Sequence, residues 1–257
     1  MDEQTNTLTL REKQWLLDEK YAGEATAEYE ADVARLEAGE LVDYLIGHRE
    51  FLGCHIDLSN RPLIPRNETE YWVQNIISRP QDRSPTPIYV LDMCAGSGCI
   101  GLALLSHLPH VQVDFAEYNP DFVQQITKNL EINKIDDTRY QVYESDMFGA
   151  LPSTQYDLIV SNPPYIARDR RETVQESVHN HEDHGSLYAD DNGLYFIKQI
   201  IDTLPHHLAP DGQCYIEYDP WQTDLITEYL DTNHPHLDYQ VLKDQNDKDR
   251  VVRIIKN

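Results

Sequence analysis

Short apolar runs alternate with longer amphipathic segments from residue 88 to the end of this chain. The short runs predict buried strands, and the segments with an apolar residue every three or four positions predict helices. Strands are expected at 88–93, 111–116, 140–143, 156–161 and 214–218, helices at 102–108, 120–132 and 194–204, and a terminal hairpin at 239–243 and 250–255. This order predicts an α/β fold with a mostly parallel sheet.

The first 80 residues have a different pattern. Residues 10–46 carry helical periodicity, with Thr26 in the position of an N-cap and Gly39 in that of a stop. A β-hairpin is predicted over 50–63, where Gly53 and the pair Ser59-Asn60 supply turns.

A helix should follow through residues 72–77, with Asn67 as its N-cap. The proline-rich stretch 80–87 indicates a connector. We therefore expect a short helical part at 1–48, a hairpin and linker helix at 49–80, and a larger domain at 81–257.

The chain is strongly acidic, because 45 Asp and Glu against 21 Lys and Arg give a formal charge of −24. Such a charge repels polyanions, so we expect no direct nucleic-acid binding. Hydrophobic residues make up 40% of the chain, which suffices for a sizeable core. The four cysteines have no C-x-x-C spacing, and the chain starts without an apolar signal segment. We expect reduced thiols, no membrane span and a cytoplasmic location.

The strand predicted at 156–161 runs into Asn162-Pro163-Pro164-Tyr165. Neither proline has a backbone N–H, so the strand stops and the corner is rich in hydrogen-bond acceptors. A planar NH2 group, of a carboxamide or of adenine, could donate to Asn162 and to the Pro163 carbonyl, with Tyr165 stacked on its face. The alternative is a proline-stiffened turn without further function.

The pattern Gly96-x-Gly98-x-x-Gly101 follows the strand at 88–93 and opens an apolar helix. Such glycines let the backbone approach a ligand at the helix N-terminus. Glu117 ends the next strand, at about the number of residues after the loop that is usual for an acid that binds the ribose hydroxyls. NAD and adenosyl cofactors both satisfy this pattern. Asp92 favours S-adenosylmethionine, because a carboxylate at the loop mouth suits an ammonium group and not a pyrophosphate.

Candidate binding residues fall at the carboxyl ends of four predicted strands: Asp92 with Gly96, Glu117, Asp146 with Met147, and Asn162. Ligands of open α/β sheets bind beyond the carboxyl ends of the strands. The four groups should therefore meet at one edge of the sheet.

These residues resemble the class I methyltransferases and, among them, the peptide-chain release factor glutamine N5-methyltransferases. Residues 92–101 are similar to that family's cofactor loop, 162–165 to its catalytic tetrapeptide, and 63–70 to the segment before its cofactor domain. Further matches at 44–47, 50–51, 189–194, Glu217 and 249–251 extend the resemblance over residues 36–257. It implies a Rossmann-like class I methyltransferase fold with a seven-stranded, mostly parallel sheet, a terminal antiparallel hairpin, and a small N-terminal helical part with a β-hairpin.

The resemblance also implies roles for individual residues. S-adenosylmethionine would be held by Asp92, Cys94, Ala95, Gly96, Ser97, Gly98, Glu117, Tyr118, Asp146, Met147 and Asn162. Catalysis would fall to Asn162, Pro163, Pro164 and Tyr165, and substrate binding to Pro65, Arg66, Thr69, Asn162, Pro163 and Tyr165. The implied reaction methylates the side-chain amide of the glutamine in the Gly-Gly-Gln loop of a class I peptide-chain release factor.

Three features depart from the family pattern. Leu41-Val42 replaces a position where the family usually has proline, which is a small structural difference. The N-terminal helical part is short, and Glu182-Asp183 replaces Glu-Pro within the run His-Asn-His-Glu-Asp-His at 179–184. We expect a solvated polar loop there and no metal, because the crowded spacing does not suit a rigid tetrahedral shell.

Three alternatives stay open from the sequence. An adenine N6-methyltransferase acting on DNA or RNA would use the same tetrapeptide, although the acidic charge counts against it. A ribosomal-protein glutamine methyltransferase would differ mainly at residues 67–70. A regulator that binds the cofactor without catalysis would not need an intact tetrapeptide at 162–165.

Overall fold

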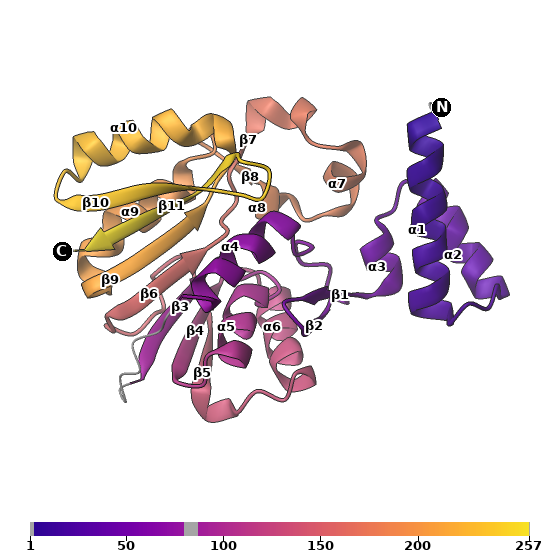
Figure 1. Ribbon diagram of the computed structural model, residues 1–257, viewed down its shortest axis with the longest axis horizontal. Helices are drawn as coiled ribbons and strands as arrows, with labels where there is room; N and C mark the ends of the chain where they lie inside the picture. The colour runs from indigo at the N-terminus through magenta and orange to yellow at the C-terminus, as the bar shows by residue number, and fades with distance from the viewer. Residues whose placement is uncertain (1–2, 80–86, 257) are drawn as a thin grey trace.

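Seven of the predicted apolar runs pair into one sheet, in the order β10-β11-β9-β6-β3-β4-β5 (Figure 1). The computed structural model describes the backbone of residues 3–79 and 87–256, with side chains in 10–79 and 87–256. The strands are β3 (Ile88–Met93), β4 (Val111–Glu117), β5 (Tyr140–Glu144), β6 (Tyr156–Ser161), β9 (Leu208–Glu217), β10 (Leu237–Lys243) and β11 (Asp249–Lys256). β5, β4, β3, β6 and β9 run parallel, whereas β11 is antiparallel to β9 and β10. The predicted mostly parallel sheet with a terminal antiparallel hairpin is confirmed.

Helices cover both faces of this sheet. They are α4 (Asn67–Ile77), α5 (Cys99–His107), α6 (Pro120–Ile132), α9 (Tyr195–His207) and α10 (Thr223–Asn233). Successive strand residues point to opposite faces, so Val90 packs in the core with α4, α5 and α6, and Leu91 in the core with α9 and α10. Burial on both faces explains why these strands are continuous apolar runs.

Helix starts follow the predicted chemistry except at α4. Thr26 caps α2 (Ala27–Glu37), since its hydroxyl accepts the Tyr29 N–H at 3.2 Å. The prediction that Asn67 caps α4 is wrong, because Asn67 is already the first helical residue and Arg66 holds the cap position. The Asn67 side chain instead accepts a hydrogen bond from Arg49 at 2.7 Å, which ties α4 to the hairpin.

β9 begins six residues earlier than the predicted 214–218. Its pairing with β6 shifts register, with Leu208 opposite Tyr156 and Gln213 opposite Leu158. The extra residues form an irregular stretch that includes Asp211 at a φ of +61°. Because these residues are mostly polar, the apolar pattern did not predict them as part of the strand.

α1 (Glu3–Tyr21), α2 and α3 (Val42–Ile46) form a helical lobe at one end of the molecule (Figure 1). Leu16, Leu36 and Leu45 belong to a core of its own, separate from the two cores of the sheet. α2 ends at Glu37, close to the predicted stop at Gly39. Helices were predicted throughout this region, and the structure confirms them.

A hairpin of β1 (His48–Phe51) and β2 (Cys54–Asp57) joins the lobe to the sheet domain. It is shorter than the predicted span 50–63. Leu52 and Gly53 both have positive φ, of +49° and +76°, which is the conformation of a two-residue hairpin turn. The turn predicted at Ser59-Asn60 lies beyond the hairpin, where the Asn60 N–H donates to Gln125 of α6.

A small insertion separates β6 from α9. It comprises β7 (Ile166–Ala167), the 3-10 helix η2 (Arg168–Thr173), α7 (Glu176–His181), α8 (His184–Leu187) and β8 (Tyr188–Ala189), and the remaining short helices are η1 (Asp137–Arg139) and η3 (Pro220–Gln222). β7 and β8 pair in parallel as a separate two-stranded sheet.

No helix in the described ranges combines the length and apolar character needed to cross a membrane. The connector predicted at 80–87 falls almost entirely outside the described residues, so the division of the chain at 48 and 80 stays a prediction.

Candidate active site

A cavity of about 460 Å³ opens at the carboxyl ends of β3, β4 and β6. β3 lies between β4 and β6, and a point where connections leave to both sides is the usual ligand site of such sheets. The volume is typical of small-molecule sites. The predicted residues that line the cavity are Pro65, Thr69, Cys94, Ala95, Gly96, Ser97, Glu117, Tyr118, Asp146, Met147, Asn162 and Pro164. Five predicted residues are not part of its lining, namely Arg66, Asp92, Gly98, Pro163 and Tyr165.

The glycine loop between β3 and α5 leaves room on its cavity side. Gly96 has a φ of +57°, and a Cβ placed there would meet no atom within 4 Å. Gly101 has a different task, since a Cβ there would come within 2.4 Å of the Phe115 ring. The first glycine therefore shapes the loop, and the last lets α5 pack closely on β4.

Glu117 is fixed at the end of β4 by backbone amides. Its carboxylate accepts the N–H of Gly96 at 2.8 Å and that of Asn119 at 2.9 Å. Burial raises the pKa of this carboxyl, and the hydrogen bonds from backbone N–H groups oppose the shift. Each oxygen keeps a lone pair for a further donor, so the site suits a pair of ligand hydroxyls.

Two non-glycine residues of the lining have left-handed backbone conformations. Cys94 has a φ of +58° and Met147 a φ of +49°, and their sulfur atoms lie 3.9 Å apart. Such conformations cost on the order of 1–3 kcal/mol each and persist only where the surroundings impose them. Around Met147, the Ser145 hydroxyl donates to its carbonyl at 2.7 Å and accepts the Ala150 N–H at 3.0 Å. The cavity wall is thus built of backbone that the fold holds under strain.

Asp92 lies beneath the glycine loop and not at its mouth, where the sequence argument placed it. The side chain is fully buried, one oxygen accepts the Gly101 N–H at 2.8 Å, and the other has no partner among the described residues. Burial raises the pKa of Asp92 to about 8. A direct contact between Asp92 and a bound ammonium group stays a prediction.

Asn162 is oriented by a chain of hydrogen bonds that begins at Trp72. The indole N–H of Trp72 can only donate, and it donates to Glu217 at 2.8 Å. The Thr69 hydroxyl donates to the same carboxylate oxygen at 2.7 Å, so its own oxygen is left to accept from Asn162 at 3.2 Å. The Asn162 Nδ2 group is thereby occupied as a donor, and its Oδ1 has no hydrogen-bond donor among the described residues, so it can accept one from a ligand. We call Asn162, Thr69, Trp72 and Glu217 the acceptor corner.

The charge at the acceptor corner is deeply buried. Glu217 is 1% exposed, and burial raises its pKa, while hydrogen bonds from Trp72 and Thr69 oppose the shift. Tyr165 donates to the other Glu217 oxygen at 3.2 Å. Its hydroxyl therefore lies behind the corner, and its predicted stacking on a substrate amide stays a prediction.

Arg66 has a partner that the sequence did not reveal. It forms an ion pair with Glu182, whose side chain is fully buried and also accepts the Ile64 N–H at 3.2 Å. The expectation of a solvated polar loop at 179–184 is therefore wrong for Glu182. This pair ties the insertion to the segment before α4, and contact of Arg66 with substrate stays a prediction.

Some residues of the cavity and of the acceptor corner escaped the sequence argument. The insertion and the start of α9 contribute Asp183, Gly185, Ser186, Tyr195 and Phe196 to the cavity. Trp72 and Glu217 were assigned no role, although Glu217 is a lone acid at the carboxyl end of a strand. The rule that singled out Glu117 would have found it. No comparable sequence signal marks Trp72, because its position in the helical pattern is that of an ordinary core residue of α4.

The cavity thus offers acceptors at two ends of an apolar space. Glu117 suits hydroxyl groups at one end, and Asn162 suits an NH2 group at the other. Tyr118, which is 73% exposed, stands at the rim. This arrangement fits a nucleoside-type ligand that meets a second, amide-bearing ligand at Asn162.

Comparisons with known proteins agree with this geometry. A family model described as a methyltransferase small domain matches residues 82–218. The release factor glutamine methyltransferase of Geobacter sulfurreducens is 33% identical over 220 residues, which cover 86% of this chain and 75% of that protein. The protein of the same name from Streptococcus pneumoniae is also 33% identical over 220 residues, covering 85% and 76%.

Solved structures share the fold at low sequence identity. A methyltransferase from Pyrococcus furiosus superposes with a TM-score of 0.58 at 14% identity, over 88% of this chain and 97% of that chain. The N-terminal domain of human METTL16 in complex with SAH gives a TM-score of 0.53 at 21% identity, over 80% and 76%. The predicted class I methyltransferase fold is confirmed.

Proposed function

We propose that this chain methylates the glutamine of the Gly-Gly-Gln loop of a release factor and that Asn162 holds its amide. The chain belongs to the release factor glutamine methyltransferase family. It uses S-adenosylmethionine to methylate a release factor glutamine. One observation carries the proposal. Asn162 lines the same cavity as Glu117 and the glycine loop, so one space can hold a nucleoside and an amide together.

The residues at the glycine-loop end suit S-adenosylmethionine. Glu117 would accept from the ribose hydroxyls, Gly96 and its neighbours would hold the methionine part, and Asp146 and Met147 would lie at the adenine. The unfilled space beside Gly96 and the acceptor capacity of Glu117 support this assignment. When bound, the cofactor supplies a methyl group on a positively charged sulfur.

Asn162 makes a poor nucleophile usable by position and by charge. A carboxamide nitrogen delocalises its lone pair into the carbonyl, so it attacks weakly without help. Hydrogen bonds from its two N–H groups to Asn162 Oδ1 and to the Pro163 carbonyl would hold the nitrogen in line with the methyl group. They also place partial negative charge where the nitrogen becomes positive. The methylated amide loses its proton readily, so no strong base is needed.

The acceptor corner explains why Asn162 presents oxygen and not nitrogen to the substrate. Its Nδ2 is bound to Thr69, and that hydroxyl cannot reverse direction, because Trp72 and Thr69 both donate to Glu217. Thr69, predicted to bind substrate, acts in this proposal as a positioning residue.

We further propose that the protein substrate enters as a loop and that the enzyme acts in the cytoplasm. A glycine-rich loop can thread a side chain into the cavity, whereas a base of a duplex would first have to be flipped out. The formal charge of −24 opposes a phosphate backbone, so nucleic acid is not the expected partner. All four cysteines are free, as is usual in a reducing compartment.

The test uses labelled S-adenosylmethionine and three acceptors. A folded class I release factor should gain one methyl group on its loop glutamine, located by peptide mass analysis. A release factor with that Gln replaced by Ala should gain none, and neither should adenine-containing DNA or RNA. Label on nucleic acid, or on the Gln→Ala protein, would show that the substrate assignment is wrong.

A further inference from the structure

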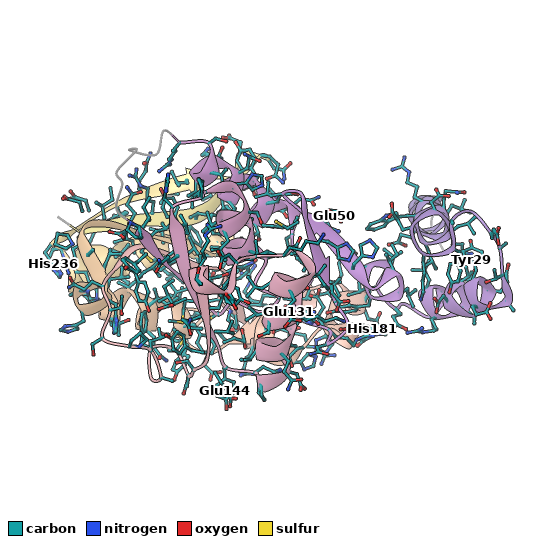
Figure 2. All side chains as sticks on the ribbon, turned by 90° about the horizontal axis from the view of Figure 1, so that it is seen from below. Tyr29, Glu50, Glu131, Glu144, His181 and His236 are labelled. Carbon is teal, nitrogen blue, oxygen red and sulfur yellow. The ribbon has the colours of Figure 1, made fainter. Side chains whose placement is uncertain are left out.

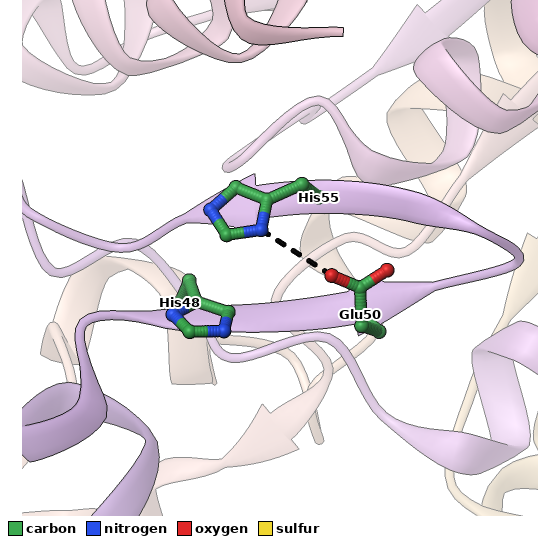
Figure 3. A group of neighbouring side chains, drawn as sticks. All are labelled: His48, Glu50 and His55. Carbon is green, nitrogen blue, oxygen red and sulfur yellow. Dashed lines mark hydrogen bonds and ion pairs between the residues drawn. The ribbon is translucent and has the colours of Figure 1, made fainter. Parts of the chain in front are cut away.

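Three potential metal ligands project from one face of the hairpin that joins the helical lobe to the sheet domain. They are His48, Glu50 and His55, and Figure 3 shows their side chains together above the two strands. Their ligand atoms all lie within 4.8 Å of one another. None of them lines the cavity, so this cluster is separate from the active site.

The strand register places the three side chains together. His48 and Glu50 are two residues apart on β1, and His55 of β2 lies directly opposite Glu50. Side chains alternate between the faces of a strand, so these three share the outer face. Phe51 and Ile56 are buried on the other face.

The distances already approach those of a coordination shell. The Nδ1 atom of His55 lies 3.3 Å from a Glu50 oxygen. Bonds of roughly 2.0–2.2 Å around a tetrahedral zinc ion put neighbouring ligand atoms about 3.3 Å apart. The His48 and His55 rings are stacked, with centroids 4.4 Å apart. The ligand atoms lie within 4.8 Å of one another, so the two stacked rings and Glu50 would each turn and move their ligand atoms by on the order of 1 Å to complete the set.

The backbone beneath the cluster is fixed. Asn133 of α6 accepts the His55 N–H at 2.9 Å and donates to the His55 carbonyl at 2.7 Å. At the turn, Leu52 donates to Glu70 at 2.9 Å. Only side chains would therefore move on binding an ion, and the His48 ring has no hydrogen-bond partner among the described residues to give up.

We propose that His48, Glu50 and His55 bind one divalent transition-metal ion of the zinc class, with water in the open position. Two imidazoles and one carboxylate form a ligand set that zinc uses, and Mg²⁺ and Ca²⁺ prefer oxygen ligands. The formal charge of the whole chain, −24, favours the approach of any cation. Asp57, opposite His48, is already paired with Lys128 at 2.9 Å, so it is not counted as a ligand.

The ion would link the two strands at the junction between lobe and sheet domain. Figure 2 shows Glu50 at the end of the sheet domain that faces the lobe carrying Tyr29. A metal bridge there would stabilise the hairpin, since an ion that binds only the folded state raises the stability.

The chain supplies its own matched control. His179 and His184 are also stacked, with ring centroids 4.5 Å apart. One nitrogen of each ring is engaged, since His179 Nδ1 contacts the Tyr188 hydroxyl and His184 Nε2 the His179 carbonyl, both at 2.8 Å. Among the described residues this pair also has no third potential ligand grouped with it. This pair should not bind the ion.

The experiment titrates the full chain, without a histidine tag and freed of metal by chelation, with Co²⁺ and Zn²⁺. We expect one Co²⁺ per chain, a tetrahedral visible absorption band, and a higher melting temperature with Zn²⁺, none of it displaced by excess Mg²⁺. His48→Ala, His55→Ala and Glu50→Gln should each weaken binding at least about tenfold, and the double variant His179→Ala/His184→Ala should not.

Three results would overturn the site: no stoichiometric binding by the parent chain, unchanged binding in all three single variants, or loss of binding in the control. A thiolate-to-cobalt charge-transfer band would also do so, because it would place the ion on a cysteine.

Discussion

The two ends of the cavity are held in place by different means. At the glycine-loop end, Glu117 accepts one backbone N–H from Asn119, two residues away, and one from Gly96, 21 residues away, and the wall contains backbone of positive φ at Cys94 and Met147. At the other end, Asn162 is fixed by side chains from α4 and β9, which lie 93 and 55 residues away in the chain. The first end is built within one β-α-β unit, whereas the second is assembled from segments far apart in the chain.

Because of this difference, substitutions at the two ends should impair different steps of the reaction. A change at the glycine-loop end should weaken cofactor binding, because we propose that those residues contact the cofactor and not the substrate. A change at the acceptor corner should slow methyl transfer with little effect on cofactor binding. Each substitution below is therefore measured both by cofactor affinity, from calorimetry, and by turnover at saturating cofactor.

The largest effect is expected from Asn162→Ala. In the proposed mechanism the variant lacks the acceptor for the reacting nitrogen, and loss of one such group typically costs on the order of 10²-fold or more in turnover. The dissociation constant for the cofactor should change only a few-fold, and circular dichroism should show an intact fold. Turnover near the parent rate would mean that the tetrapeptide is only a turn.

Glu117→Gln should have the opposite signature. The amide keeps one acceptor oxygen but loses the charge that ribose hydroxyls would bind, and hydrogen bonds to charged groups contribute roughly 1.5–3 kcal/mol. Cofactor affinity should fall about tenfold or more, with turnover at saturation nearly unchanged. Equal losses of affinity in Glu117→Gln and Asn162→Ala would remove the distinction between the two ends.

Thr69→Val tests the hydrogen-bond chain itself. Valine keeps the shape but frees Asn162 to rotate its amide, so turnover should fall about fivefold to tenfold, less than for Asn162→Ala. Thr69→Ser should restore it.

Glu217→Gln separates orientation from charge in the same chain. Its amide oxygen can still accept from Trp72 and Thr69, so turnover should stay within a few-fold of the parent. A loss as large as that of Asn162→Ala would mean that the buried charge, and not the orientation of Asn162, matters.

The same contrast explains what the sequence could predict. The glycine loop, Glu117 and the seven strands were predictable because each depends on neighbours in the chain or on apolar periodicity. The partners of Asn162 and Arg66 were not, because Thr69, Glu217 and Glu182 meet them only after folding. Glu182 lies in a run of polar residues, so no apolar periodicity indicates that it is buried. Its pairing with Arg66 could be predicted only from the position of the insertion in the folded structure.

The last prediction concerns the stability of the fold and Asp92, which the sequence argument placed at the mouth of the glycine loop and the structure buries beneath it. Its pKa in the folded protein is about 8, above the ordinary value of 3.8. Between these values the folded protein holds a proton that the unfolded chain has released. The contribution of Asp92 to the free energy of unfolding is therefore complete below pH 3.8 and is lost as the pH rises through about 8.

Asp92→Asn isolates this contribution, because asparagine is similar in shape and neutral at every pH. Denaturant unfolding from pH 5 to 9 should show the parent losing stability relative to the variant as the pH rises. Saturating S-adenosylhomocysteine should flatten that difference if its ammonium group reaches Asp92, because a nearby positive charge favours the ionised carboxyl. Parallel pH profiles for parent and variant would mean that Asp92 does not titrate in this range. A difference that the ligand leaves unchanged would limit Asp92 to holding the Gly101 N–H, as the last support of the loop and not as a contact of the cofactor.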